Sequence, residues 1–109
     1  MSQLNQKCLE ACQQCIVDCQ TCLSEMLGET SSNACPACCV QCIEVCQLCV
    51  AAIARQTPFM EQICRLCAEV CQWCAEQCGE HSHQHCQKCA ESCRACAEEC
   101  SKLAGQAAH

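Results

Sequence analysis

Aromatic side chains are almost missing from this chain of 109 residues, which has one Phe, one Trp and no Tyr. Conventional core material is therefore scarce, because aromatic and large aliphatic side chains normally supply most of the buried apolar area. The hydrophobic fraction of 51% is misleading, since cysteine and alanine make up most of it. The length still suffices for one core, and we expect residues 1–109 to form a single domain.

Basic residues are also few, with six Lys and Arg against twelve Asp and Glu and a net charge of -6. Such a chain offers no basic patch to nucleic acid or to an anionic membrane surface, and we expect neither as a partner. Residues 1–7 lack the basic and apolar regions of a signal peptide. We also expect no segment that spans a membrane, and a cytoplasmic location.

The abundant residue is cysteine, which occupies 21 positions. Twenty of these recur at alternating steps of three and four residues, the spacing of one face of a helix. They form four groups of five: Cys8, Cys12, Cys15, Cys19 and Cys22; Cys35, Cys39, Cys42, Cys46 and Cys49; Cys64, Cys67, Cys71, Cys74 and Cys78; Cys86, Cys89, Cys93, Cys96 and Cys100. With short connections, this pattern predicts an all-α fold, an antiparallel up-down-up-down four-helix bundle with a cysteine-lined core.

Glycine, proline and capping residues between the groups predict where the helices begin and end. The first predicted helix covers 3–27 and ends before Gly28, and the second runs from Asn33, its cap, to about 55, with Pro36 in its first turn. The third runs from Thr57, its cap, to Gly79, with Pro58 at the first position. The fourth runs from Ser82, its cap, to about Gly105.

A secreted disulfide scaffold is one explanation of so many cysteines. The odd count, the missing export signal and the helical period argue against it. Neighbouring cysteines on one helix could be bridged only with distorted geometry. A single cysteine could also be a small buried hydrophobe, but twenty in register would pack less apolar volume than Leu and Ile. We interpret the pattern as reduced thiols that bind a soft metal.

Thiolates select Cu(I), Zn(II), Cd(II) or iron-sulfur clusters. No four cysteines here follow the ferredoxin spacing. Zn(II) held by four thiolates leaves two negative charges, which is costly when many sites share a dry interior. Cu(I) with one thiolate per ion is neutral and accepts two or three sulfurs. A buffer for Zn(II) or Cd(II) stays open, as does a thiol oxidoreductase, although the latter needs one exposed pair with a depressed pKa. We do not expect an enzyme.

The sequence resembles the bacterial cytosolic copper storage proteins over almost its whole length. The resemblance is carried by the cysteine-lined helices and by the CxxxC pairs Cys8 with Cys12, Cys15 with Cys19, Cys42 with Cys46, Cys67 with Cys71, Cys74 with Cys78, Cys89 with Cys93 and Cys96 with Cys100. It implies storage of multiple Cu(I) ions per chain inside the bundle, commonly as a homotetramer. We predict all 21 cysteines as metal ligands; the resemblance supplies no role for Cys38, beside Cys39 and one step off the cysteine face.

One pole of the predicted bundle gathers softer and weaker metal ligands, namely Met26, His81, His83 and His85, next to Cys35 and Cys38. We hypothesise that this pole is the mouth, where thioether and imidazole groups capture Cu(I) and pass it inward. The opposite pole, with Asn5, Ile53, Met60 and Leu103, is mostly apolar and is expected to be a plug. The plainer alternative is that the histidines lie in a solvated loop.

A second apolar stripe follows the third helix, at Phe59, Ile63, Leu66, Val70 and Trp73. Its outer members point away from the cysteine face, so one bundle cannot bury all of it. We therefore expect a homo-oligomer, with scattered exposure of these side chains as the alternative. No copper donor or acceptor protein can be named from the sequence.

Overall fold

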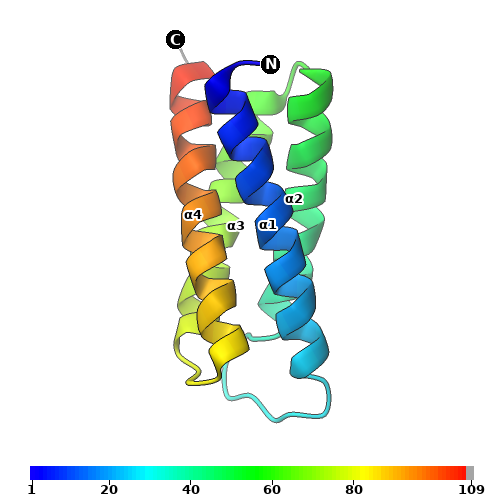
Figure 1. Cartoon of the computed structure of the whole chain (residues 1–109), viewed down its shortest axis with the longest axis vertical. Helices are drawn as coiled ribbons and strands as arrows, with labels where there is room; N and C mark the ends of the chain where they lie inside the picture. The colour runs from blue at the N-terminus through cyan, green and yellow to red at the C-terminus, as the bar shows by residue number, and fades with distance from the viewer. Residues whose placement is uncertain (108–109) are drawn as a thin grey trace.

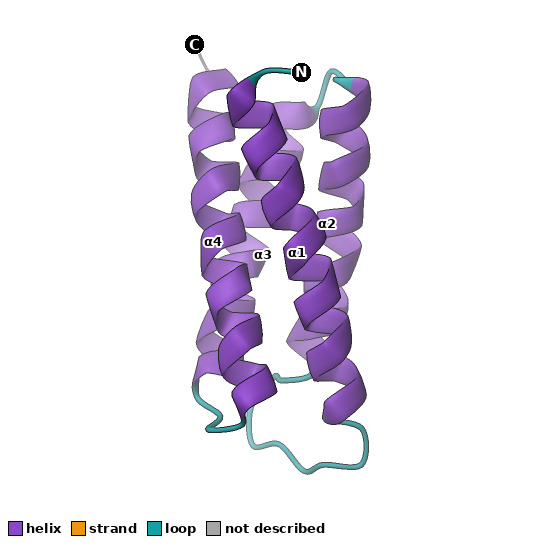
Figure 2. Ribbon diagram, in the orientation of Figure 1, coloured by secondary structure: helices purple, strands orange, loops and turns teal. Residues whose placement is uncertain are grey.

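The structure is a computed structural model that describes residues 1–107. It contains four helices, α1 (Gln3–Glu25), α2 (Ala37–Arg55), α3 (Met60–Gly79) and α4 (Gln84–Ala107). Successive helices run antiparallel, so α1 begins and α4 ends at the same end of an elongated bundle of 43 × 19 × 18 Å (Figure 1). Each helix packs against two neighbours, α1 and α3 each contacting both α2 and α4. The predicted all-α, antiparallel four-helix bundle is confirmed, and Figure 2 shows only helices and loops over the described residues.

The loop between α1 and α2 departs from the prediction. Gly28 does take the left-handed conformation just after α1, with a φ of 83°. Asn33, however, does not cap α2, which begins at Ala37. Its side-chain oxygen instead accepts a hydrogen bond from the backbone N–H of Cys35 at 2.9 Å. Asn side chains compete with helices in this way, and here the local turn delays the helix by about one turn.

The predicted starts of the third and fourth helices are two residues and one residue too early. Thr57 belongs to the end of α2 and does not cap α3. Its backbone N–H donates to the carbonyl of Ala52 at 3.1 Å, and the residue before it, Gln56, has the left-handed conformation that ends α2. As a result α3 begins only at Met60. The helix α4 begins at Gln84, one residue later than a cap at Ser82 requires. Differences of this size are usual at helix ends.

The helices bury different side chains beside their cysteine faces. On α2 the buried flanking residues are the aliphatic Ile43, Val45 and Ile53. Between α3 and α4 they are alanines, which include Ala75, Ala90 and Ala97. Alanine lets two helices approach closely, and the approach continues to the end of α3, where a Cβ on Gly79 would lie 3.3 Å from Nη2 of Arg94. The cysteines thus occupy the centre while small and branched side chains seal the seams.

Asp18 on α1 is the one buried charged side chain among the residues whose burial is described. Its carboxylate accepts hydrogen bonds from Nε2 of Gln14 at 3.1 Å and from the hydroxyl of Ser92 on α4. Nζ of Lys88, also on α4, lies 3.9 Å away. Buried charges need such partners. Asp18 therefore ties α1 to α4 beside the cysteine core.

Among the described helices, α2 is long and apolar enough to cross a membrane by length and composition. The expectation that no segment reaches that limit is wrong for this helix. Half of its apolar window is buried inside the bundle, where its cysteines face the core. Its hydropathy is thus explained by a core position, since the core helix of a globular bundle meets the same criterion.

Candidate metal centre

All 21 cysteines are free thiols, and none is more than 1% exposed. Each helix places its cysteines at steps of three and four, so its sulfurs form one line facing the bundle axis. Because the four helices face one another, their sulfurs meet in a single column. We call the Sγ atoms of the twenty regularly spaced cysteines the sulfur column.

The column contains overlapping groups of sulfurs that lie close enough to share a metal ion. In each of five such groups the sulfur atoms all lie within 4.8 Å of one another. These groups are Cys8, Cys12, Cys49 and Cys100; Cys12, Cys46, Cys67 and Cys96; Cys15, Cys42, Cys46 and Cys71; Cys15, Cys19, Cys42 and Cys93; Cys19, Cys39, Cys74 and Cys89. Successive groups share members such as Cys12 and Cys15. The arrangement is continuous rather than a set of separate four-sulfur cages.

Closed triangles of sulfur recur along the column. The Sγ atoms of Cys15, Cys42 and Cys93 are separated by 3.5, 3.9 and 3.7 Å. Those of Cys46, Cys67 and Cys71 are separated by 3.8, 3.8 and 3.9 Å. An ion at the centre of such a triangle would lie about 2.2 Å from each sulfur, close to the roughly 2.3 Å of a zinc–thiolate bond. The spacing therefore suits three-coordinate binding of a first-row metal ion without movement of the helices.

The charge of the core also discriminates between metals. Asp18 is the only buried charged residue among those described, and no Lys or Arg is buried with the sulfurs. Thiolates in this interior would have no cationic side chain to neutralise them, and uncompensated buried charge is costly. A monovalent ion for each thiolate leaves the core neutral. This favours Cu(I) over a divalent ion at high occupancy.

Burial keeps the thiols of Cys35 and Cys86, at the pole of Met26 and His85, protonated when no metal is bound. It raises the pKa of Cys35 to about 11 and also raises the pKa of Cys86 above its ordinary value of 9.0. A metal ion that binds these sulfurs must displace their protons. Proton release should therefore accompany metal uptake, and the apparent affinity should rise with pH through the neutral range.

Two of the predicted uptake ligands reach the sulfur column. Met26 is buried, with its Sδ atom 3.9 Å from Sγ of Cys86. Nδ1 of His85 lies 3.5 Å from the same sulfur. The column thus ends at this pole in a thioether and an imidazole. His83 is exposed, and its ring stacks on that of His85 with centroids 5.2 Å apart.

His81 has a different environment, because it joins the two loops at this pole. Its Nε2 atom lies 3.0 Å from both Oγ of Ser31 and Oδ1 of Asn33. The amide nitrogen of Asn33 also donates to the carbonyl of Gln77 at 2.9 Å and to Glu80 at 2.7 Å. We call this set the loop clasp. It holds the α1–α2 loop against the end of α3, and the sequence pattern gave no signal for it.

The opposite pole is closed by apolar side chains. Ile53 is fully buried and Leu103 is 4% exposed, while Asn5 and Met60 are partly buried. These residues lie past the last cysteines, such as Cys49 and Cys100. Their arrangement agrees with the expected plug.

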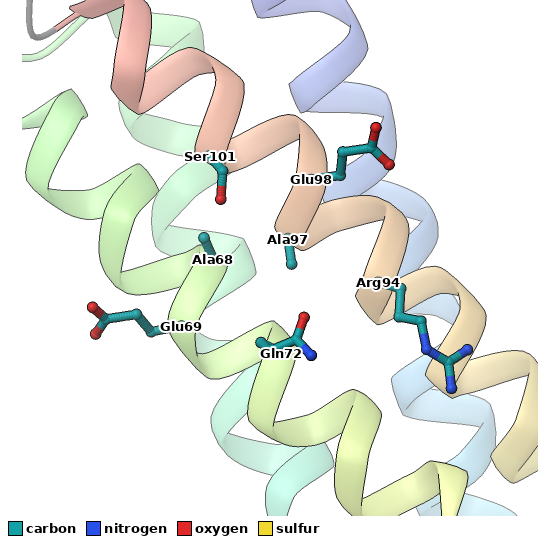
Figure 3. Close-up of a pocket in the computed structure, with 7 residues that line it drawn as sticks. All are labelled: Ala68, Glu69, Gln72, Arg94, Ala97, Glu98 and Ser101. Carbon is teal, nitrogen blue, oxygen red and sulfur yellow. The ribbon is translucent and has the colours of Figure 1, made fainter.

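The outer surface contains a groove of about 490 Å³ between α3 and α4. Figure 3 shows the residues that line it on α3 and α4, namely Ala68, Glu69, Gln72, Arg94, Ala97, Glu98 and Ser101. No cysteine is among the lining residues. This groove is therefore separate from the sulfur chemistry of the interior.

The outer members of the α3 apolar stripe are exposed, as predicted. Phe59, Leu66 and Trp73 are 65, 49 and 39% exposed. Ile63 and Val70 are partly buried. The stripe thus offers an apolar surface that this single chain leaves open to solvent.

Fold and site together define a class of protein, a thiol-lined four-helix bundle built to hold soft metal ions. A family model described as copper storage protein matches residues 1–105. The chain belongs to the copper storage protein family, and the predicted family is confirmed.

Individual relatives agree with this assignment. An uncharacterised cysteine-rich protein of Bacillus subtilis strain 168, YhjQ, is 39% identical over 88 residues, which are 78% of this chain and 82% of that protein. The Cu(I)-bound copper storage protein BsCsp3 is 39% identical, with a TM-score of 0.88 over 94% of this chain and 99% of its own. A cytosolic copper storage protein from Streptomyces lividans, solved with five coppers, is 29% identical, with a TM-score of 0.85 over 94 and 92% of the two chains.

Proposed function

We propose that this protein stores Cu(I) in the cytoplasm, as many ions per chain bound by thiolates of all 21 cysteines. The observation that carries the proposal is the continuous column of closed sulfur triangles in an interior without cationic side chains. Relatives of similar fold that bind Cu(I), and one described as cytosolic, support it. The whole chain acts as one storage domain and has no catalytic role.

Anaerobic titration of the fully reduced protein with Cu(I), against a chromogenic chelator, tests the storage function. We expect saturation at or above about ten ions per chain, half an ion for each of the 21 cysteines. Saturation at one or two ions would contradict the proposal, because most thiols would then serve only packing. Parallel titrations with Zn(II) and Cd(II) test the alternative function, a buffer for these two ions. If that function is correct, Zn(II) or Cd(II) should displace Cu(I) at equal thiol occupancy.

We further propose that copper enters at the histidine pole. Met26 and His85 lie against Cys86 at the end of the column, and His83 stacks on His85 at the surface. Thioether and imidazole groups are weaker Cu(I) ligands than thiolates, so they can capture an ion and release it inward. His81 takes part through the loop clasp, which positions the α1–α2 loop beside this mouth.

Replacing His83 and His85 by alanine should slow copper uptake about tenfold, equivalent to about 1.4 kcal/mol in the barrier, while the capacity stays the same. The reason is that both imidazoles lie outside the column and contribute no thiolate. Stopped-flow absorbance in the ultraviolet, where copper–thiolate bands develop, measures the rate. Gln84→Ala is the matched control, because Gln84 lies between the two histidines in the chain, is exposed, and carries no imidazole. An unchanged uptake rate in the double variant would contradict copper entry at this pole.

The chain is also proposed to form a homo-oligomer, the tetramer that the family resemblance implies. The support is the exposed apolar stripe of Phe59, just before α3, and Leu66 and Trp73 on α3. Exposed apolar surface of this kind is typical of subunit interfaces. Sedimentation equilibrium tests the proposal, and a monomer at micromolar concentration would contradict it.

A further inference from the structure

Cys38 does not fit the regular spacing of α2, whose column cysteines are Cys35, Cys39, Cys42, Cys46 and Cys49. A residue one step from the central face of a helix usually lies at its flank. The side chain of Cys38 is nevertheless fully buried. Its Sγ atom lies 3.4 Å from that of Cys74 and 3.7 Å from that of Cys78, both on α3. Cys38 therefore extends the sulfur of the core sideways, into the contact between α2 and α3.

The three sulfurs form a closed triangle, because those of Cys74 and Cys78 are themselves 3.9 Å apart. The point equidistant from all three lies about 2.1 Å from each, close to the roughly 2.3 Å expected of a metal–thiolate bond. Cys74 and Cys78 are one helical turn apart, so α3 fixes their spacing. Cys38 lies in the first turn of α2, where the helix dipole stabilises a thiolate.

This triangle is lateral to the column. Cys74 and Cys78 already belong to the column, and the neighbouring layer takes one sulfur from each helix, from Cys19, Cys39, Cys74 and Cys89. That layer is complete without Cys38. The triangle uses α2 and α3 alone, and it joins the column through Cys78, whose sulfur lies 3.6 Å from Cys39 and 3.8 Å from Cys89.

We propose that Cys38, Cys74 and Cys78 form an additional Cu(I) site beside the column, occupied by an ion that the column alone does not hold. The inference rests on the proposed storage function and deepens it. Cu(I) binds without change of oxidation state, and each thiol that becomes a ligand releases its proton to solvent. Cys74 and Cys78 can bridge this ion to those of the column, which keeps the charge of the cluster low.

Native mass spectrometry of the Cu(I)-saturated protein tests the site in solution. Cys38→Ser keeps the size of the side chain but removes the thiolate, and it should lower the maximum copper content by about one ion per chain. Val45→Ala is the control, because Val45 is buried on the same helix and carries no sulfur. Its copper content should equal that of the unaltered protein. Equal copper content in Cys38→Ser and the unaltered protein would overturn the lateral site.

Anomalous diffraction from crystals of the loaded, unaltered protein locates the ion directly and does not depend on the folding of a variant. We expect a copper peak equidistant from the three sulfurs, in addition to peaks along the column. Peaks confined to the column would overturn this inference and leave the storage function intact. A protein that binds only one or two ions in total would instead contradict the storage function itself.

Discussion

Filling the core with Cu(I) is expected to raise the melting temperature of this protein by more than about 20 °C. The apo core consists mainly of thiols, which pack less apolar volume than Leu or Ile. A ligand that binds only the folded state adds about 4 kcal/mol per site at a thousand times its dissociation constant, and about 1 kcal/mol shifts the melting temperature of a domain of this size by roughly 4–8 °C. A few occupied sites are therefore enough to raise the melting temperature by this amount.

Circular dichroism at increasing copper content, under anaerobic conditions, measures this effect. The melting temperature should rise stepwise with each addition and return to the apo value when a strong Cu(I) chelator removes the metal. Titration with Zn(II) provides the comparison, and we expect a smaller rise, because buried zinc thiolates retain negative charge. A melting temperature that does not depend on copper content would show that the ions bind outside the core.

Interrupting the column at its middle should have the second large effect. Cys15, Cys42, Cys71 and Cys93 meet there, with Sγ of Cys42 lying 3.5 Å from those of Cys15 and Cys71. Replacing all four by alanine should remove about four ions, at one per thiolate. It should also delay filling of the thiols between this layer and the apolar pole, because no sulfur remains to pass ions across. Copper content followed against time, after addition of excess Cu(I), separates the two effects.

The matched control removes the same number of thiols at the apolar pole. Cys8, Cys49, Cys64 and Cys100 lie there, with Sγ atoms of Cys8 and Cys100 3.4 Å apart and those of Cys49 and Cys64 3.8 Å apart. Their replacement by alanine should cost a similar number of ions without slowing the remainder. If both variants fill at the same rate, copper does not travel along the column from a single mouth.

The cysteine faces could be predicted from the sequence because a helix fixes which residues share a face. Steps of three and four placed Cys12, Cys46 and Cys96 on the inner faces of three helices, and the structure brings their sulfur atoms into one group although they are far apart in the chain. Helix ends were less predictable. Asn33 and Thr57 are both good caps by residue type, yet the side-chain oxygen of Asn33 accepts from the N–H of Cys35, and the hydroxyl of Thr57 makes no hydrogen bond to a described residue.

Two features of the site depend on how helices pack, and residue spacing could not reveal them. In the loop clasp the side-chain amide of Asn33 donates to the backbone carbonyl of Gln77, a contact that residue type does not indicate. Cys38 falls outside the regular spacing of α2. Its contacts with Cys74 and Cys78 depend on where α3 packs, which the spacing does not give. In both cases the partner lies about forty residues away, beyond any local pattern.

The buried plug at Ile53 and Leu103 has a consequence for the order in which stored metal becomes available. With copper admitted at one pole alone, as proposed, the ions bound nearest Cys86 are the last to arrive and the first to leave. Metal beside Cys8 and Cys64 would then remain as a slowly exchanging reserve. Such a protein would supply recently acquired copper during brief shortage and would yield its oldest copper only when nearly empty.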